Sequence, residues 1–110
     1  MKFAIPLAEG KLTAHFGHCE EFAIIDVDGD NIKSKEILVP PRHEPGVLPR
    51  WLHDLGANVI IAGGMGQKAQ SLFSEQGITV VVGAPSEEPE SLIKSYLNNA
   101  LISGDNLCDH

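Results

Sequence analysis

The second half of the chain alternates short apolar runs with longer segments that have helical spacing. The apolar runs are residues 58–62 and 78–82, which have the length and the Val/Ile content of strands buried on both faces. The helical segments are residues 65–76, which end before Gly77, and residues 89–101. Because this alternation is typical of parallel strands joined by helices, it places the chain in the α/β class.

The first half predicts strands before any helix. Residues 2–7, 21–27 and 32–39 have the composition of strands, and the last two flank Asp28-Gly29-Asp30-Asn31, a strong hairpin turn signal. A proline-rich loop then leads to a helix at residues 47–55. The order β-β-β-α-β-α-β-α predicts a three-layer α/β domain with a mixed five-stranded sheet, parallel except for one strand of the hairpin.

Length, charge and hydropathy indicate the number of domains and the kinds of partner to expect. A chain of 110 residues is expected to form one domain, at residues 1–102, followed by a polar tail at 103–110. A formal charge of −7 without a Lys/Arg patch argues against a nucleic-acid partner. No apolar run approaches the roughly 20 residues of a membrane span, and the N-terminus does not read as a signal peptide. We therefore expect a cytoplasmic protein with no membrane partner.

Both cysteines and three of the five histidines lie in two short segments near opposite ends of the sequence. Cytoplasmic thiols stay reduced, so the cysteines are better interpreted as ligands, redox thiols or incidental residues than as a disulfide. Imidazole nitrogen and thiolate sulfur suit iron, copper, zinc and iron-sulfur species, whereas Mg and Ca prefer oxygen. The candidate metal ligands, which can also be incidental loop residues, are His15, His18, Cys19, Cys108 and His110.

Three loops are expected to leave the carboxyl ends of parallel strands, at residues 8–20, 63–66 and 83–86. Ligands of open α/β sheets bind at that edge. Gly64 and Gly66 would let the backbone approach a ligand, and N–H groups at a helix start favour an anion. Tight packing of helix against sheet explains these glycines equally well. A match to the dinucleotide fingerprint G-x-G-x-x-A is weak, because no acidic residue follows the next strand to bind a ribose.

The sequence does not assemble a known catalytic arrangement. It has no G-x-S-x-G motif, and no pair of carboxylates is expected at the ends of parallel strands. Cys19 beside His18 leaves open an activated thiol, because an adjacent imidazolium lowers a thiol pKa. We expect a protein that is not an enzyme, with a small thiol oxidoreductase as an alternative.

Several motifs in consistent order span nearly the whole chain. They are Ala4-Ile5-Pro6, His15-Phe16-Gly17 followed by Phe22, Gly63-Gly64-Met65-Gly66 with Ala69, and Gly77-Ile78-Thr79-Val80 leading to Gly83-Ala84. With these motifs the chain resembles the dinitrogenase iron-molybdenum cofactor biosynthesis family, whose small domains are related to NifX, NafY and the C-terminal part of NifB. The resemblance implies a ribonuclease H-like fold and a cofactor-biosynthesis accessory protein.

The resemblance also implies a ligand: an iron-molybdenum cofactor, its precursor, or another iron-sulfur or molybdenum-sulfur cluster. His15 matches the family's motif histidine, and the Cys108/His110 tail is similar to that of some stand-alone members. The expected cofactor-binding residues are His15, Gly17, His18, Gly64, Met65 and Gly66. The implied partners are proteins that donate and accept the cluster, and the expected state is a monomer or weak homo-oligomer. The alternative is a metal-free regulatory or protein-interaction module of the same fold.

Overall fold

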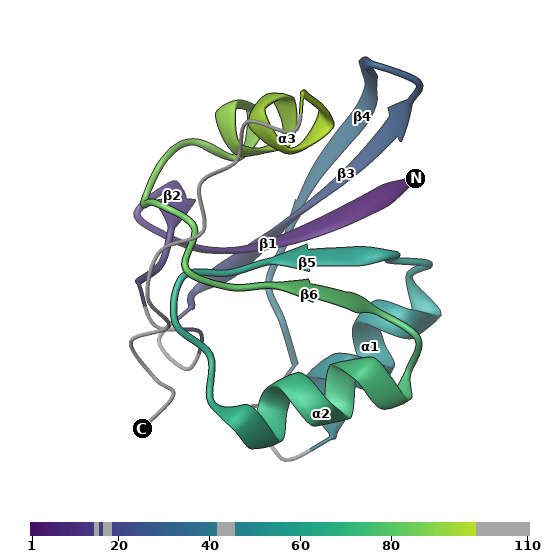
Figure 1. The fold of residues 1–110 in the computed structure, drawn as a ribbon, viewed down its shortest axis with the longest axis vertical. Helices are drawn as coiled ribbons and strands as arrows, with labels where there is room; N and C mark the ends of the chain where they lie inside the picture. The colour runs from purple at the N-terminus through teal and green to yellow at the C-terminus, as the bar shows by residue number, and fades with distance from the viewer. Residues whose placement is uncertain (15, 17–18, 42–45, 99–110) are drawn as a thin grey trace.

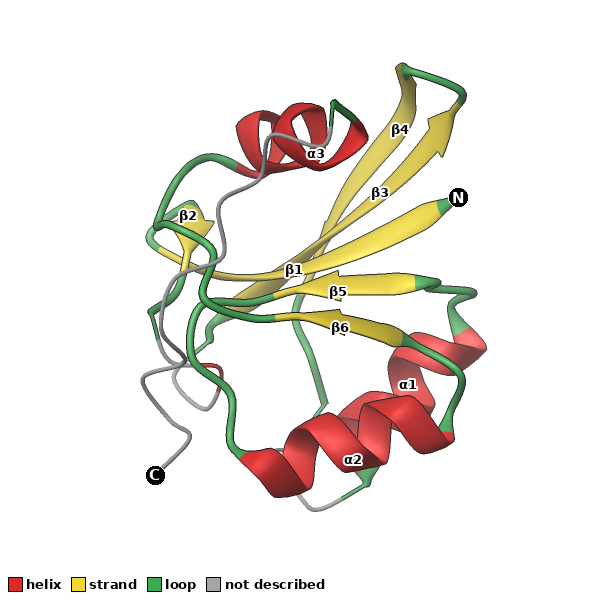
Figure 2. Ribbon diagram, in the orientation of Figure 1, coloured by secondary structure: helices red, strands yellow, loops and turns green. Residues whose placement is uncertain are grey.

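The computed structural model describes residues 1–14, 16, 19–41 and 46–98. Within these residues a sheet lies between α3 on one face and α1 and α2 on the other, which gives three layers (Figures 1 and 2). None of the described helices is long and apolar enough to cross a membrane. The elements are β1 Lys2–Ala8, β2 Lys11–Leu12, β3 Glu21–Asp28, β4 Asn31–Leu38, α1 Val47–Asp54, β5 Val59–Ile61, α2 Gln67–Glu75, β6 Thr79–Val81 and α3 Pro89–Leu97.

The strand order is β4-β3-β1-β5-β6, and β2 pairs with β1 outside this path. β1, β5 and β6 are parallel, whereas β3 is antiparallel to both β1 and β4. Along the main path, β3 is therefore the one strand of opposite direction, and this part of the sequence-based prediction is confirmed. The two βαβ crossovers use α1 and α2, which leaves α3 to cover the other face.

The predicted strand number was wrong, because the described sheet has six strands rather than five. The additional strand, β2, lies in the segment that was predicted to be a loop. Leu7 pairs with Leu12 across a two-residue turn in which Glu9 and Gly10 have φ of 56° and 82°. Positive φ at both turn positions matches the twist of paired strands, but glutamate is an unusual residue for the first of them. The name ribonuclease H-like stays a prediction.

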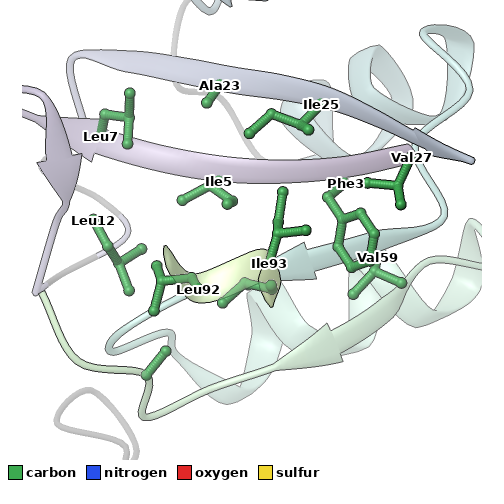
Figure 3. Packing of buried hydrophobic residues seen from close by; sticks show 12 residues of the cluster. Phe3, Ile5, Leu7, Leu12, Ala23, Ile25, Val27, Val59, Leu92 and Ile93 are labelled. Atoms are coloured by element: carbon green, nitrogen blue, oxygen red, sulfur yellow. The ribbon is translucent and has the colours of Figure 1, made fainter. Parts of the chain in front are cut away.

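The central strands of the sheet are buried on both faces, and β1 contributes to both cores. Along β1 the side chains alternate, so Phe3 and Ile5 join the core under α3 while Ala4 joins the core under α1 and α2. Figure 3 shows Leu92 and Ile93 of α3 packed among the β1 and β3 side chains of the first core. A central strand buried on both faces leaves the strand ends and their loops as the natural place for a ligand.

The loops that follow β1 and β5 are joined by backbone hydrogen bonds. The Gly64 N–H donates to the Ala14 carbonyl at 2.6 Å, and the Phe16 N–H donates to the Gly64 carbonyl at 2.8 Å. The loop after β6 is joined to the same group, because the Gly83 N–H donates to the Gly63 carbonyl at 2.6 Å. The three loops therefore form one bonded edge at the carboxyl ends of the parallel strands (Figure 1).

Gly63 is required at this edge because the neighbouring backbone is too close for a side chain. A Cβ on Gly63 would lie 2.8 Å from the Thr13 carbonyl oxygen and 2.9 Å from the Ala14 carbonyl oxygen. Both contacts are shorter than van der Waals packing allows, and backbone atoms held in hydrogen bonds cannot move aside cheaply. This close approach joins two loops, so it differs from the packing of helix against sheet that the sequence suggested for Gly64 and Gly66.

We predict that Gly63→Ala lowers the free energy of unfolding by about 1–3 kcal/mol, because the new methyl group forces the first loop away from β5. Gly66→Ala is the matched control, since a Cβ on Gly66 meets nothing within 4 Å. Its φ of −64° is also open to alanine, so the control should change stability by less than about 1 kcal/mol. Urea denaturation of both variants measures the difference, and equal midpoints would contradict the close approach.

Candidate functional site

The N-terminus of α2 lies at the bonded edge, and among the described residues no side chain caps it. The helix begins at Gln67 after Gly66, whose extended backbone serves as N-cap without a side-chain cap hydrogen bond. The first N–H groups of a helix have no partner inside the helix, and the helix dipole adds a partial positive charge there. The start of α2 is therefore suited to an anion.

The start of α3 differs in charge from the start of α2. Glu88 is the N-cap of α3 and Glu90 lies in its first turn, so carboxylates already offset the helix dipole. The first turn of α2 contains no acidic residue and includes the exposed Lys68. A negatively charged ligand is consequently favoured at the start of α2 and disfavoured at the start of α3.

The segment before α2 is fixed by a side-chain contact. The Gln70 Nε2 donates to the Met65 carbonyl at 2.9 Å, and the Gln70 N–H donates to the Gly66 carbonyl at 3.1 Å. These bonds tie the first turn of α2 to the segment that leads into it. The orientation of the helix start is thus set before any ligand arrives, which lowers the entropic cost of binding.

The structure separates the roles of the three residues predicted in the glycine-rich segment. The Gly64 N–H is already bonded to Ala14, so it is not among the donors open to a ligand. Met65 is fully buried in the core under α1 and α2 and acts there as a packing residue. Gly66 is partly exposed and borders the helix start directly. Of the three, Gly66 is the residue whose position best suits ligand contact.

Cys19 lies in the core under α1 and α2 rather than on the surface. Burial raises the pKa of its thiol to about 11, and a backbone hydrogen bond only partly opposes this rise. The Cys19 N–H donates to the Phe16 carbonyl at 3.2 Å. The thiol is therefore protonated at neutral pH, and its role as a metal ligand stays a prediction.

The other predicted ligands lie outside the described residues. Among the described residues, no group of three or more His, Cys, Asp or Glu side chains is placed to hold a metal ion. The predicted site residues outside the described ranges are His15, Gly17, His18, Cys108 and His110. Their roles stay predictions.

Sequence reasoning did not assign a site role to Phe16, which links the loop after β1 to two other elements. Its ring lies edge-on to Phe22 of β3 and to Phe73 of α2, with centroid distances of 6.2 and 5.6 Å. The available signal was the aromatic content of three apolar segments, but aromatic residues far apart in sequence do not reveal which of them meet. The contacts of Phe16 with Phe22 and Phe73 could be identified only from the three-dimensional structure.

Known proteins resemble this chain over most of its length. The family model described as dinitrogenase iron-molybdenum cofactor matches residues 1–99. MJ0580 of Methanocaldococcus jannaschii, an uncharacterized protein, is 35% identical over 106 residues, which cover 92% of this chain and 89% of that protein.

Solved structures show the same fold. PH0822 aligns with a TM-score of 0.86 at 30% identity and covers 94% of both chains. The apo form of the orange protein from Desulfovibrio gigas aligns with a TM-score of 0.75 at 19% identity, covering 96% of this chain and 93% of that chain. At that identity the second likeness concerns the fold alone. The match to the family model extends over nine-tenths of the sequence, and the chain belongs to the dinitrogenase iron-molybdenum cofactor family.

Proposed function

We propose that this protein binds and carries an anionic metal-sulfur cluster at the edge where the loops after β1, β5 and β6 meet. Family membership relates the chain to accessory proteins of the nitrogenase iron-molybdenum cofactor. The cargo is that cofactor, its precursor, or another iron-sulfur or molybdenum-sulfur cluster. The protein holds the cargo and passes it from a donor protein to an acceptor protein without changing its chemistry.

The observation that carries the proposal is the uncapped start of α2 at the bonded edge. Its first-turn N–H groups, which no described side chain caps, and its positive dipole stabilise the negative charge that sulfide and thiolate confer on such clusters. The hydrogen bonds of Gly64 fall on Ala14 and on Phe16, one on each side of position 15. Ala14 and Phe16, the described sequence neighbours of position 15, are therefore both bonded to Gly64, two residues before the N-cap of α2.

Side chains supply the bonds to metal in this proposal. His15 and His18 offer imidazole nitrogens, and Cys108 with His110 offers further ligands from the other end of the chain. Backbone N–H groups solvate the sulfides of the cluster, while imidazole takes an open metal position. Binding weakens at acid pH, because a protonated imidazole has no lone pair left for a metal.

The first test is retention of a cluster by anaerobically purified apo-protein. The protein is mixed with iron-molybdenum cofactor, or separately with a simpler iron-sulfur or molybdenum-sulfur cluster, and is then passed over a sizing column. Elemental analysis of Fe, Mo and S should show stoichiometric retention by the wild type. We expect His15→Ala to retain at least about tenfold less, because a lost metal ligand removes a strong bond.

His53→Ala is the control for this experiment, since His53 is exposed on α1, next to Asp54. The control should retain the cluster as well as the wild type does. Equal retention by His15→Ala and the wild type would refute His15 as a ligand. Absence of retention for every cluster tried would favour the metal-free regulatory or protein-interaction module.

A second prediction tests the helix start. Gly66→Asp and Gly66→Asn both place a good N-cap side chain on α2, but only aspartate adds a negative charge. We expect Gly66→Asp to bind the cluster about tenfold more weakly than Gly66→Asn, because the carboxylate occupies the donors and repels the anion. Circular dichroism should show the same helix content in both. Equal affinities would show that the cluster does not sit at α2.

A third prediction addresses the alternative of a thiol oxidoreductase, which needs a reactive thiolate. A pKa of about 11 leaves Cys19 with a thiolate fraction at pH 7.5 far below that of a free cysteine. In a Cys108→Ser variant, Cys19 should react with a disulfide reagent at least about a hundredfold more slowly in the native protein than in urea. If native Cys19 reacted as fast as it does in the unfolded chain, the result would support the thiol oxidoreductase alternative.

The same thiol affects stability in a defined pH range. Because folding raises the pKa of Cys19, the stabilisation from its neutral form is present below the pKa of the unfolded thiol. It is lost as the pH rises through about 11. Stability near neutral pH is consequently insensitive to this group.

A further inference from the structure

Phe16 contacts several of the elements that surround the proposed site. Its ring meets Phe73 of α2 with an interplanar angle of 83° and Phe22 of β3 with an angle of 68°. Its N–H donates to the Gly64 carbonyl, and its own carbonyl accepts from the Cys19 N–H. One residue therefore connects the loop after β1 to β3, to α2 and to the loop after β5.

The burial of Phe16 differs from that of its aromatic partners. Phe22 and Phe73 are fully buried, whereas Phe16 is partly exposed at the margin of the same core. A ring at the margin contributes less to the hydrophobic core than the rings beneath it. Its geometry is nevertheless constrained from two sides by edge-to-face contacts and at both backbone groups by hydrogen bonds.

We propose that Phe16 is the positioning residue of the site. It holds the loop after β1 in register with the start of α2, so that ligands from that loop and N–H groups from α2 converge on one cluster. This inference rests on the proposed function. A phenyl ring has no atom that coordinates a metal, so Phe16 acts through Gly64 and α2 rather than as a ligand.

The expected effect follows from what the ring contacts contribute. Leucine at position 16 keeps most of the apolar volume but loses both edge-to-face contacts, which are specific to aromatic rings. The loop then samples arrangements in which its ligands do not meet the α2 donors. The apparent affinity for the cluster decreases in proportion to the fraction of protein that keeps the binding-competent arrangement. We expect the Kd for the cluster to rise about tenfold in Phe16→Leu.

The chain contains its own optical probe for this measurement. Trp51 is the single tryptophan, and its ring lies 5.6 Å from Phe22, which in turn contacts Phe16. Metal-sulfur clusters absorb light in the range of tryptophan emission, so a cluster bound at the site quenches Trp51. Titration of apo-protein with iron-molybdenum cofactor or a synthetic iron-sulfur cluster thus gives a Kd for each variant.

Phe22→Leu is the comparison variant, because it removes only one of the two edge-to-face contacts of Phe16 and keeps the contact with Phe73. The Phe22 ring is fully buried, so this variant should lose more thermal stability than Phe16→Leu. We expect Phe16→Leu to bind about tenfold more weakly, and Phe22→Leu to bind within about threefold of the wild type. If affinity instead follows loss of stability across the two variants, Phe16 is a packing residue and the inference is wrong.

A measurement on the apo-protein tests the positioning role of Phe16 without any cluster. The Gly64 amide, bonded to Ala14, should exchange its hydrogen about tenfold faster in Phe16→Leu, whereas amides of β5 should keep the wild-type rate. Unchanged exchange at Gly64 would overturn the inference. Wild-type protein that retains no cluster would refute the proposed function, whereas retention with unchanged affinity in Phe16→Leu would refute the positioning role alone.

Discussion

The site depends on a close backbone contact between the loops that follow β1 and β5. Gly63 and Gly64 lie directly against the backbone of Thr13, Ala14 and Phe16. This contact brings a loop from the start of the chain to the N-terminus of a helix about 50 residues later. Since parallel strands β1 and β5 are neighbours, their carboxyl ends already lie side by side, and the glycines convert proximity into hydrogen bonds.

The charge of the protein requires that an anionic cargo be held by short-range interactions. The chain has a formal charge of −7, so its long-range field repels an anionic cluster. At physiological salt that field is screened beyond about 8 Å, whereas helix N–H groups and metal-ligand bonds act at contact distance. In the proposed function such contacts are made at the start of α2, whose first turn contains no carboxylate.

The order of elements was readable from the sequence because it depends on local periodicity. The buried runs near Val59 and Val80 and the helix stops at Gly56 and Gly77 each reflect a few neighbouring residues. Strand β2 was missed because its turn requires a positive φ at Glu9, and glutamate is not a residue from which a positive φ is predicted. The burial of Cys19 and the meeting of Phe16 with Phe73 depend on how distant segments pack, and no local pattern encodes that.

In the proposed site, the groups that hold the charge of a ligand are separate from the groups that select its metal. The described part of the edge offers backbone N–H groups and a helix dipole, and both respond to the negative charge of a cargo rather than to the metal it contains. Selectivity among metals comes from the softness and geometry of side-chain ligands, and the sequence-based candidates for these are His15, His18, Cys19, Cys108 and His110. In the proposed function, the helix start therefore holds the charge of the cluster, and the side-chain ligands select its metal.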